Sequence, residues 1–447
     1  MENEQLILYS AIEANILPII SGCDSSCVFC SHHNNPEGVR VLSMPPRNLD
    51  QIEYTLRFLN RRQKITIGES ATNIIEGEPL CHPQFREILS MVRKRFPFTQ
   101  VSITTNGHRL DENTVEFLKR VEPLEISISL NSATTEGRSI LMGDSPHIAE
   151  QTLEGVKLLS QYKIEFYGSI VAMPHLVGWN DIEETLKYLA DNGATTVRIF
   201  LPAFSKKAGP RLQFDVSLMQ KELKTFVDDM AENTPCPVLL EPSYVSDLTP
   251  VISGVILGTK AWEAGLRRGD IIKHVNGRIP RSRVESWGFM QMPGMIDVEV
   301  ERNGESLNLR WDNGRGGRSG AILGYDFDMH RMETIRSFIS SCRGKVLALS
   351  SEFAYDVLKA VFQIMEIPEH RAEVQMVKNH LFGGSIMAAG LLSVDDFSMA
   401  LEEYCSDHER PNYLLLPLEP FDWQGYDITG RHFEELTRIT GIETKIM

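Results

Sequence analysis

The sequence Cys23-Asp24-Ser25-Ser26-Cys27-Val28-Phe29-Cys30 places three thiols in a C-x3-C-x2-C pattern, directly after the apolar run at 16–20. The apolar run predicts a short buried strand, so the cysteines are expected on the loop that leaves its carboxyl end. Three thiolates on one short loop can hold three corners of an iron–sulfur cluster. The fourth iron would then have no protein ligand and could bind a substrate or cosubstrate.

The cysteines also allow two other interpretations. A zinc site could use His32 or His33 as its fourth ligand, but structural zinc sites usually bring together two separated pairs of ligands. Disulfides are disfavoured because seven cysteines in 447 residues are sparse and odd in number. Cys81 lies inside a motif described below. Most of the other cysteines are predicted to be small buried side chains; these cysteines are Cys236, Cys342 and Cys405.

Length and composition limit the class of protein. A chain of 447 residues predicts two to four domains, and a hydrophobic share of 42% is enough for real cores. The net charge of −15 disfavours nucleic acid as a partner. No apolar run approaches the roughly 20 residues of a membrane helix, and the first residues show no basic signal-peptide region. We therefore expect a cytoplasmic protein without a membrane partner.

Strand and helix patterns alternate over residues 1–240. The predicted strands are 16–20, 64–67, 100–105, 124–130, 166–173 and 196–201. The predicted helices are 48–59, 84–95, one starting at 111, 147–161, 182–192 and 217–233. This alternation predicts an α/β fold, an incomplete (βα)6 barrel with a parallel sheet and helices outside. The cysteine loop and three further motifs all follow strands, where barrels of this kind gather their chemistry.

With the aromatic Phe29 before the last cysteine, this motif resembles the cluster motif of the radical SAM superfamily. The resemblance implies a [4Fe–4S] cluster on Cys23, Cys27 and Cys30, with S-adenosylmethionine (SAM) bound to the open iron. It also implies reductive cleavage of SAM to methionine and a 5′-deoxyadenosyl radical, which abstracts a hydrogen atom from a substrate. A ferredoxin or flavodoxin is implied as the one-electron donor.

The resemblance extends to the loops after the next strands. Gly77-Glu78-Pro79 resembles the segment that positions the SAM amino group, although Glu76 replaces the usual first glycine and 70–75 looks inserted. The residues implied to contact SAM are Phe29, Gly77, Glu78, Pro79, Thr105, Asn106, Ser129, Asn131 and Arg138. The strand-five stretch 168–174 is implied to lie against the adenine.

Each of these motifs also has an ordinary structural interpretation. The Gly-Glu-Pro segment could simply start a helix, and Thr105-Asn106-Gly107 could be a turn. Arg138 could be a solvated charge on a helix. Cys81 could be a catalytic thiol beside the SAM site, or a buried inert thiol.

Residues 248–328 resemble a bacterial PDZ domain. The pattern consists of an apolar strand at 251–256, a short helix ending in Gly269-Asp270, a strand at 271–275 and the turn Asn276-Gly277. The stretch 298–305 alternates like a strand that enters a hairpin. PDZ domains bind extended peptides by strand addition, and the strand that carries the carboxylate-binding amides is expected at 323–327. Alternatively, the module binds no peptide and only braces its neighbours.

Residues 329–447 are predicted to form a small α/β domain. Strands are expected at 345–349, 373–377 and 412–417, the last being the final strand, and a helix from about 350 to 364. Lys378, Asn379 and His380 precede a Gly-rich loop and are candidate substrate contacts, although the loop could be a tight turn. The whole chain resembles iron–sulfur oxidoreductases that combine a radical SAM barrel, a PDZ-like module and a further C-terminal domain, with the module order permuted.

Three hypotheses on function remain open from the sequence. The enzyme could modify a peptide whose C-terminus the PDZ-like module presents. It could instead act on a small molecule or cofactor precursor, with the later domains capping the barrel. The third possibility is a non-enzymatic zinc-binding adaptor that uses the PDZ-like module to recognise peptides.

Overall fold

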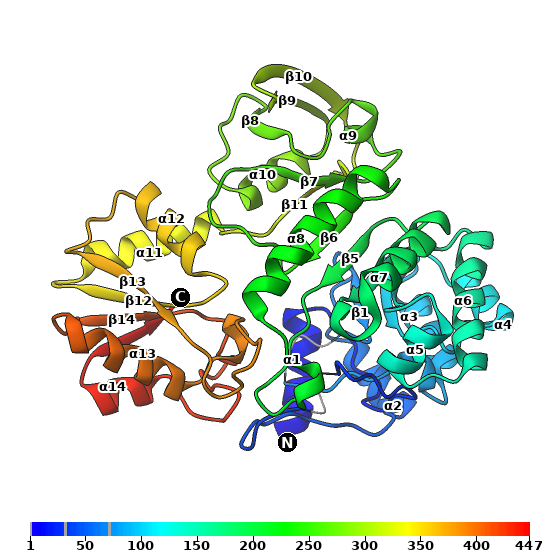
Figure 1. The fold of residues 1–447 in the computed structure, drawn as a ribbon, viewed down its shortest axis with the longest axis horizontal. Coiled ribbons are helices and arrows are strands. Elements are labelled where there is room, and N and C mark those ends of the chain that lie inside the picture. Colours follow the sequence, from blue (N-terminus) through cyan, green and yellow to red (C-terminus); the bar gives the residue numbers. More distant parts are fainter. Residues whose placement is uncertain (1, 31–33, 70–72) are drawn as a thin grey trace. The chain divides into compact units, whose positions relative to one another are not determined.

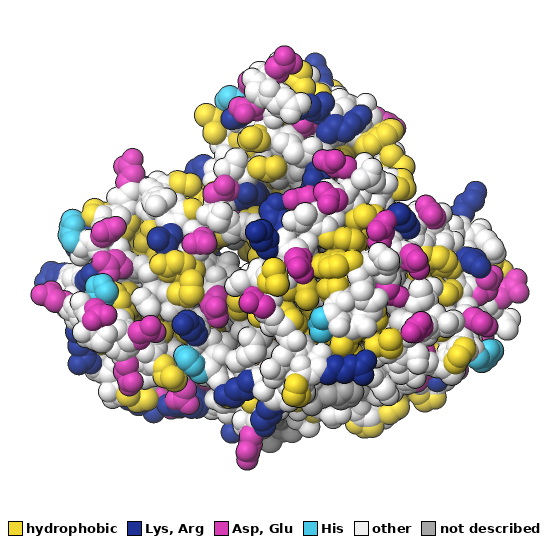
Figure 2. Space-filling view, in the orientation of Figure 1, with side chains coloured by type: hydrophobic (Ala, Val, Ile, Leu, Met, Phe, Trp, Pro, Cys, Tyr) yellow, Lys and Arg dark blue, Asp and Glu magenta, His cyan; other side chains and the backbone are white. Residues whose placement is uncertain are grey.

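The computed structural model describes residues 2–30, 34–69 and 73–447 and divides into two compact units (Figure 1). The first unit comprises residues 1–35, 40–203 and 208–241, and the second comprises 36–39, 204–207 and 242–447. On the face shown in Figure 2, acidic and basic side chains are interspersed. Among the described helices, none combines the length and the apolar character needed to cross a membrane.

A six-stranded parallel sheet forms the centre of the first unit. Its strands follow one another in chain order, and every neighbouring pair is parallel. They are β1 (Ile65–Ile67), β2 (Val101–Thr105), β3 (Leu124–Ser129), β4 (Glu165–Val171), β5 (Val197–Phe200) and β6 (Val238–Glu241). The predicted α/β fold with a parallel sheet is confirmed.

Helices connect these strands, and several begin at side chains suited to that place. Asp111 accepts a hydrogen bond from the Thr114 amide at the start of α4, and Asn48 forms a capping box with Gln51 at the start of α2. The α-helices are α1 (Glu2–Glu13), α2 (Leu49–Leu56), α3 (Phe85–Arg95), α4 (Glu112–Arg120), α5 (Thr135–Met142), α6 (Pro146–Gln161), α7 (Pro174–Asp191) and α8 (Val216–Asn233). Two short 3₁₀ helices are η2 (Pro79–Cys81) and η3 (Pro210–Leu212).

The prediction of a strand at 16–20 is wrong. Only Ile16 forms a ladder pair there, with Thr66. Pro18 lacks an N–H group, so the segment cannot continue a regular ladder, although it is buried throughout. The sixth strand is instead β6, which the sequence patterns did not indicate, and neither did they indicate α1 or α5.

The second unit begins with two small antiparallel sheets, in the orders β10-β9-β8 and β11-β7. The strands are β7 (Ile252–Val255), β8 (Ile271–Val275), β9 (Met295–Arg302), β10 (Glu305–Asp312) and β11 (Ala321–Leu323), and the helices are α9 (Lys260–Glu263) and α10 (Arg283–Met290). Asn303 and Gly304 both have positive φ, which matches the tight turn of the predicted hairpin between β9 and β10. The strand expected at 323–327 is misplaced, because β11 ends at Leu323 after pairing with β7.

A parallel sheet with the order β13-β12-β14-β15 follows. Its strands are β12 (Val346–Ser351), β13 (Ala372–Val377), β14 (Tyr413–Leu416) and β15 (Glu443–Ile446). Its helices are α11 (Met329–Ser341), α12 (Tyr355–Ile364), η4 (Ala389–Leu391), α13 (Val394–Asp407) and α14 (Glu434–Thr440). Apolar residues from both faces of β12 enter two separate cores, which is typical of a central strand.

Two predictions for this region need correction. Ser350 and Ser351 continue β12, because they pair with Met376 and Val377, and the next helix begins only at Tyr355. The strand β14 is not the last, since β15 pairs with it. Asn379 is a turn residue: its Nδ2 donates to the Leu391 carbonyl at 2.7 Å, and its Oδ1 accepts from the Phe382 amide.

Candidate active site

The cysteine loop is held by the carboxyl end of α5. The Ser26 amide donates to the carbonyl of Met142 at 3.1 Å, and the Val28 amide donates to the carbonyl of Leu141 at 2.9 Å. The Ser25 hydroxyl also donates to the Met142 carbonyl, at 3.3 Å. The last carbonyls of a helix have no partner within it, so donors from another segment can satisfy them. The end of α5 therefore sets the backbone course of the loop.

The three cysteines of this loop are free thiols, with Cys23 exposed and the other two half-buried. Ser25 contacts two of them: its amide donates to Cys23 Sγ at 3.4 Å, and its hydroxyl lies 3.0 Å from Cys27 Sγ. Burial raises the pKa of Cys23 and raises the pKa of Cys27 to about 11. Both are therefore neutral thiols near pH 7 in the metal-free chain.

This donor set fits an iron–sulfur cluster. Within residues 2–30, 34–69 and 73–447, no three His, Cys, Asp or Glu side chains converge to hold a single metal ion. A [4Fe–4S] cluster needs no such convergence, because each thiolate binds a different iron. His32 and His33, the predicted zinc ligands, lie outside the described residues.

Gly77 lies against the backbone that leads into Cys23. Its amide donates to the Ile20 carbonyl, and the next amide, of Glu78, donates to the Gly22 carbonyl, both at 2.9 Å. A Cβ atom on Gly77 would lie 2.1 Å from the Gly22 carbonyl oxygen. The close approach of the two backbones therefore requires glycine at this position.

We expect Gly77→Ala to displace the cysteine loop and to lower the free energy of unfolding by about 1–3 kcal/mol, because the added methyl overlaps backbone atoms. The checks are the melting temperature and the iron content after anaerobic purification. Gly209→Ala is the matched control, since that glycine has an ordinary φ of −58° and no atom within 4 Å of an added Cβ. Equal results for the two variants would contradict the prediction.

The buried carboxylate of Glu78 joins the loop after β1 to the end of β2. It accepts hydrogen bonds from the Leu80 amide (3.1 Å), the Thr105 hydroxyl (2.8 Å) and the Asn106 amide (2.7 Å). Burial raises the pKa of Glu78 to about 7, although these donors oppose the shift. Two of the motifs that the sequence singled out are thus brought together at the carboxyl ends of neighbouring strands.

Two of the predicted SAM contacts are engaged inside the protein. Asn131 donates to the Ser129 carbonyl at 3.0 Å and accepts from the Val171 amide at 2.9 Å, so it ties β3 to β4. Arg138 has no exposed surface, and its Nη1 donates to the Leu130 carbonyl at 2.6 Å. The alternative interpretation of Arg138 as a solvated charge on a helix is therefore wrong, and its contact with SAM stays a prediction.

The remaining residues predicted to contact SAM differ in their surroundings. Phe29 and Ser129 are half-buried, and Pro79 is buried at the start of η2. Packing explains the glycine at position 168, because an added Cβ would lie 2.6 Å from a methyl group of Leu189. Contacts of these residues with SAM stay predictions.

A chain of buried charges, which sequence reasoning missed, leads from α5 to the cysteine loop. Arg138 binds one carboxylate oxygen of Asp144 through Nε (2.8 Å) and Nη2 (2.7 Å). The other Asp144 oxygen lies 3.0 Å from Nε2 of His108, whose Nδ1 lies 3.3 Å from Asp24. His108 is 6% exposed and Asp144 also 6%. The sequence offered one indication of this chain of charges, namely that His108 directly follows the motif Thr105-Asn106-Gly107.

Asp24 is the point where this chain meets the cysteine loop. Besides His108, its carboxylate accepts hydrogen bonds from Asn106 Nδ2 and from Arg109 Nε, each at 2.9 Å. The hydrogen bond from His108 holds the pKa of Asp24 far below its usual range, against the effect of burial. Burial lowers the pKa of His108, but its hydrogen bonds to Asp144 and Asp24 outweigh this effect and raise the pKa to about 9.

The stability of the protein should therefore fall in mildly alkaline solution. Because the pKa of His108 rises from 6.5 to about 9 on folding, its contribution is complete below pH 6.5 and is lost as the pH rises through about 9. We expect this loss to be on the order of 2–3 kcal/mol. Melting temperatures between pH 6 and 10 test it, with His108→Gln as the comparison. If the melting temperature of the wild type changed with pH in the same way as that of His108→Gln, the loss of stability would not be due to His108.

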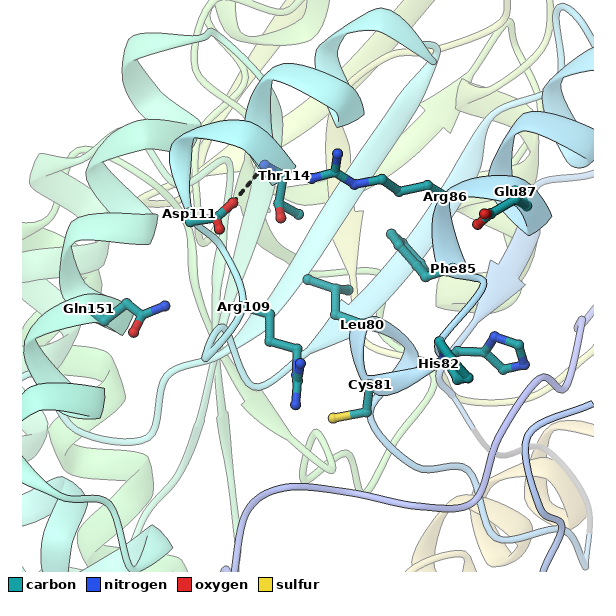
Figure 3. Close-up of a pocket in the computed structure, with 11 residues that line it drawn as sticks. Leu80, Cys81, His82, Phe85, Arg86, Glu87, Arg109, Asp111, Thr114 and Gln151 are labelled. Atoms are coloured by element: carbon teal, nitrogen blue, oxygen red, sulfur yellow. Dashed lines mark hydrogen bonds between the residues drawn. The ribbon is translucent and has the colours of Figure 1, made fainter.

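A cavity of about 520 Å³ is lined in part by Arg109, the residue that donates to Asp24, and by Cys81. Figure 3 shows Arg109 and Cys81 with their polar ends close together, Gln151 projecting from α6, and Arg86 on α3. Burial and a hydrogen bond to Asp24 raise the pKa of Cys81 to about 12. Cys81 is therefore a neutral thiol near pH 7, and this argues against a thiolate nucleophile there.

Comparison with known proteins finds similarity within the first unit. Residues 17–199 match the radical SAM superfamily. A GTP 3′,8-cyclase of Microcystis aeruginosa is 27% identical over 128 residues, which cover 29% of this chain and 37% of the cyclase. Streptococcus suis SuiB bound to S-adenosylmethionine aligns with a TM-score of 0.39 and 15% identity, over 50% of this chain and 49% of SuiB.

A further solved structure, native anSMEcpe with bound S-adenosylmethionine and a peptide, aligns with a TM-score of 0.38 and 19% identity, over 49% of this chain and 59% of anSMEcpe. The chain thus spans 37% of the cyclase and about half of SuiB. Residues 17–199 of this chain form a radical SAM superfamily domain, and the cofactors of such a domain are a [4Fe–4S] cluster and SAM.

Proposed function

We propose that the chain is a radical SAM enzyme that holds its cluster on Cys23, Cys27 and Cys30. When bound and reduced, the cluster supplies one electron that cleaves SAM into methionine and a 5′-deoxyadenosyl radical, which then takes a hydrogen atom from the substrate. The electron comes from an external donor, for which a ferredoxin or flavodoxin is the candidate. The substrate is a small molecule, a cofactor precursor or a peptide.

The observation that carries this proposal is the position of the thiols. Three free thiols stand on one loop within the matched domain, and backbone hydrogen bonds fix that loop to the end of α5. An open iron requires three protein ligands on a cluster of four irons, which is the number this loop supplies.

The chain's own residues hold the loops around this position. Gly77 allows the loop after β1 to lie against the chain before Cys23, and Glu78 binds that loop to the end of β2. Asp24 attaches the first part of the cysteine loop to Asn106 and Arg109. These contacts bring the Gly-Glu-Pro and Thr-Asn-Gly segments close to the chain around Cys23, which supports the proposal that SAM binds there.

The direct test is cleavage of SAM by anaerobically purified protein with dithionite as the reductant. We expect iron and sulfide in about equal amounts, roughly four of each per chain, and 5′-deoxyadenosine that forms only when both SAM and reductant are present. A colourless protein that holds zinc and produces no 5′-deoxyadenosine would favour the adaptor hypothesis. GTP should be included among the trial substrates, because the matched cyclase acts on it by name.

The sheet edge at β11 favours a peptide as a second ligand to test. Among the described strands, β11 pairs only with β7, so its other edge lacks a strand partner and could take an added strand. The proposed PDZ-like module at 248–328 would then bind peptides with a free C-terminal carboxylate. Fluorescence anisotropy with a set of labelled decapeptides tests this, and binding that survives C-terminal amidation would contradict it.

A further inference from the structure

His108 makes two ionic contacts that only one of its protonation states can satisfy. Its Nδ1 faces an oxygen of Asp24 at 3.3 Å, and its Nε2 faces an oxygen of Asp144 at 3.0 Å. A neutral imidazole has a single N–H donor, whereas the imidazolium has two. The two flanking carboxylates therefore favour the positively charged form of this ring, which is almost completely buried.

Both ends of this arrangement lead to elements that shape the cysteine loop. Asp144 follows α5 directly and is fixed by Arg138 of that helix. The carbonyls at the end of the same helix receive the amides of Ser26 and Val28. The first cysteine, Cys23, precedes these anchor points, and its neighbour Asp24 reaches α5 through His108.

We propose that His108 is a positioning residue for the cluster: it clamps Asp24, and with it Cys23, to the helix end that anchors the rest of the cysteine loop. This inference rests on the proposed function, because it assumes that Cys23 is a cluster ligand. His108 acts through Asp24 and does not itself touch the metal. Its loss would leave the loop anchored to α5 from Ser25 onward, while Asp24 and Cys23 move more freely.

The first experiment measures how fast the protein loses its cluster. The wild type, His108→Ala and the control His147→Ala are purified anaerobically and exposed to EDTA, and the decay of the visible absorption is followed. His147 is exposed on α6, so its variant should match the wild type. We expect His108→Ala to lose iron at least about tenfold faster, in the range typical for residues that orient metal ligands.

The second experiment asks whether His108 acts through Asp24. Asp24→Ala removes the same contact from the partly exposed side of the pair, together with the hydrogen bonds from Asn106 and Arg109. His108→Gln, a milder change than His108→Ala, is therefore measured beside it in case His108→Ala does not fold. If the clamp is real, the double variant loses iron no faster than Asp24→Ala alone, because Asp24→Ala has already broken the linkage to His108. Hydrogen–deuterium exchange on the metal-free chains should show faster exchange at residues 23–26 in each variant.

Wild-type rates of iron loss in His108→Ala, or multiplied effects in the double variant, would overturn the clamp. Unchanged exchange at residues 23–26 would do the same. Failure of the proposed function looks different: the wild-type chain itself would then bind no iron through its cysteines.

Discussion

Replacing Cys23, Cys27 and Cys30 together with alanine is expected to remove almost all iron from the purified protein, a fall from about four atoms per chain to near zero. The three thiols are the free donors on a loop whose backbone is fixed by α5. Without them the cluster has no thiolate ligands at this position. Iron and sulfide analysis with a visible spectrum, all done anaerobically, is the measurement.

The triple variant should still fold, because the hydrogen bonds that anchor the loop come from the Ser26 and Val28 amides and not from thiols. Cys405→Ala is the control, since that cysteine is exposed on α13. It should keep the full iron content and colour. A triple variant that remained brown, with normal iron, would show that these cysteines are not the ligands.

Replacing Arg138 with methionine is expected to lower the free energy of unfolding by about 3–5 kcal/mol. The Arg138 guanidinium has no exposed surface, pairs with Asp144 through two nitrogens, and donates to the Leu130 carbonyl. Methionine fills similar space, but it leaves a buried carboxylate and a buried carbonyl with fewer donors. Because His108 still faces Asp144, the effect should fall toward the lower end of this range.

Arg120→Met provides the comparison for that measurement. Arg120 pairs with Glu116 at 3.3 Å, but the two side chains are 61% and 52% exposed. Exposed pairs of this kind contribute little, so a change below about 0.5 kcal/mol is expected. Chemical denaturation of both variants would settle the contrast, and similar losses would mean that the Arg138 pair is no more important than a surface pair.

Much of the first unit could be predicted because its strands are short apolar runs followed by polar motifs. The strands around Val101, Ile126 and Ile199 were predicted from local pattern alone, and the structure places them in one parallel sheet. The same rule brought Glu78 and Thr105 to neighbouring strand ends, where they share a hydrogen bond. Local pattern was sufficient here because the spacing of apolar residues in each segment and the turn residues after it indicate the same strand.

What the sequence did not indicate depends on contacts between distant residues. The helix α5 is eight residues long, with Gly137 inside it, so its local signal is weak. It holds the cysteine loop through backbone carbonyls, and because every residue has one, the amino-acid sequence cannot indicate this role. The charge chain is hidden for another reason: Asp24, His108 and Asp144 belong to three separate loops, and only the fold brings them together.

The attachment of the cysteine loop to the end of α5 has a consequence for the order of events during protein synthesis. Ser25 and the carbonyl it binds, on Met142, are 117 residues apart. At about 5–20 residues per second, a ribosome needs roughly 6–23 seconds to make that interval. During that time the three thiols are already part of the nascent chain, but α5, the helix that binds their loop, has not yet been made. Iron delivery to this protein should therefore follow the emergence of α5 from the ribosome, and any delivery factor must act on a domain that has already begun to fold.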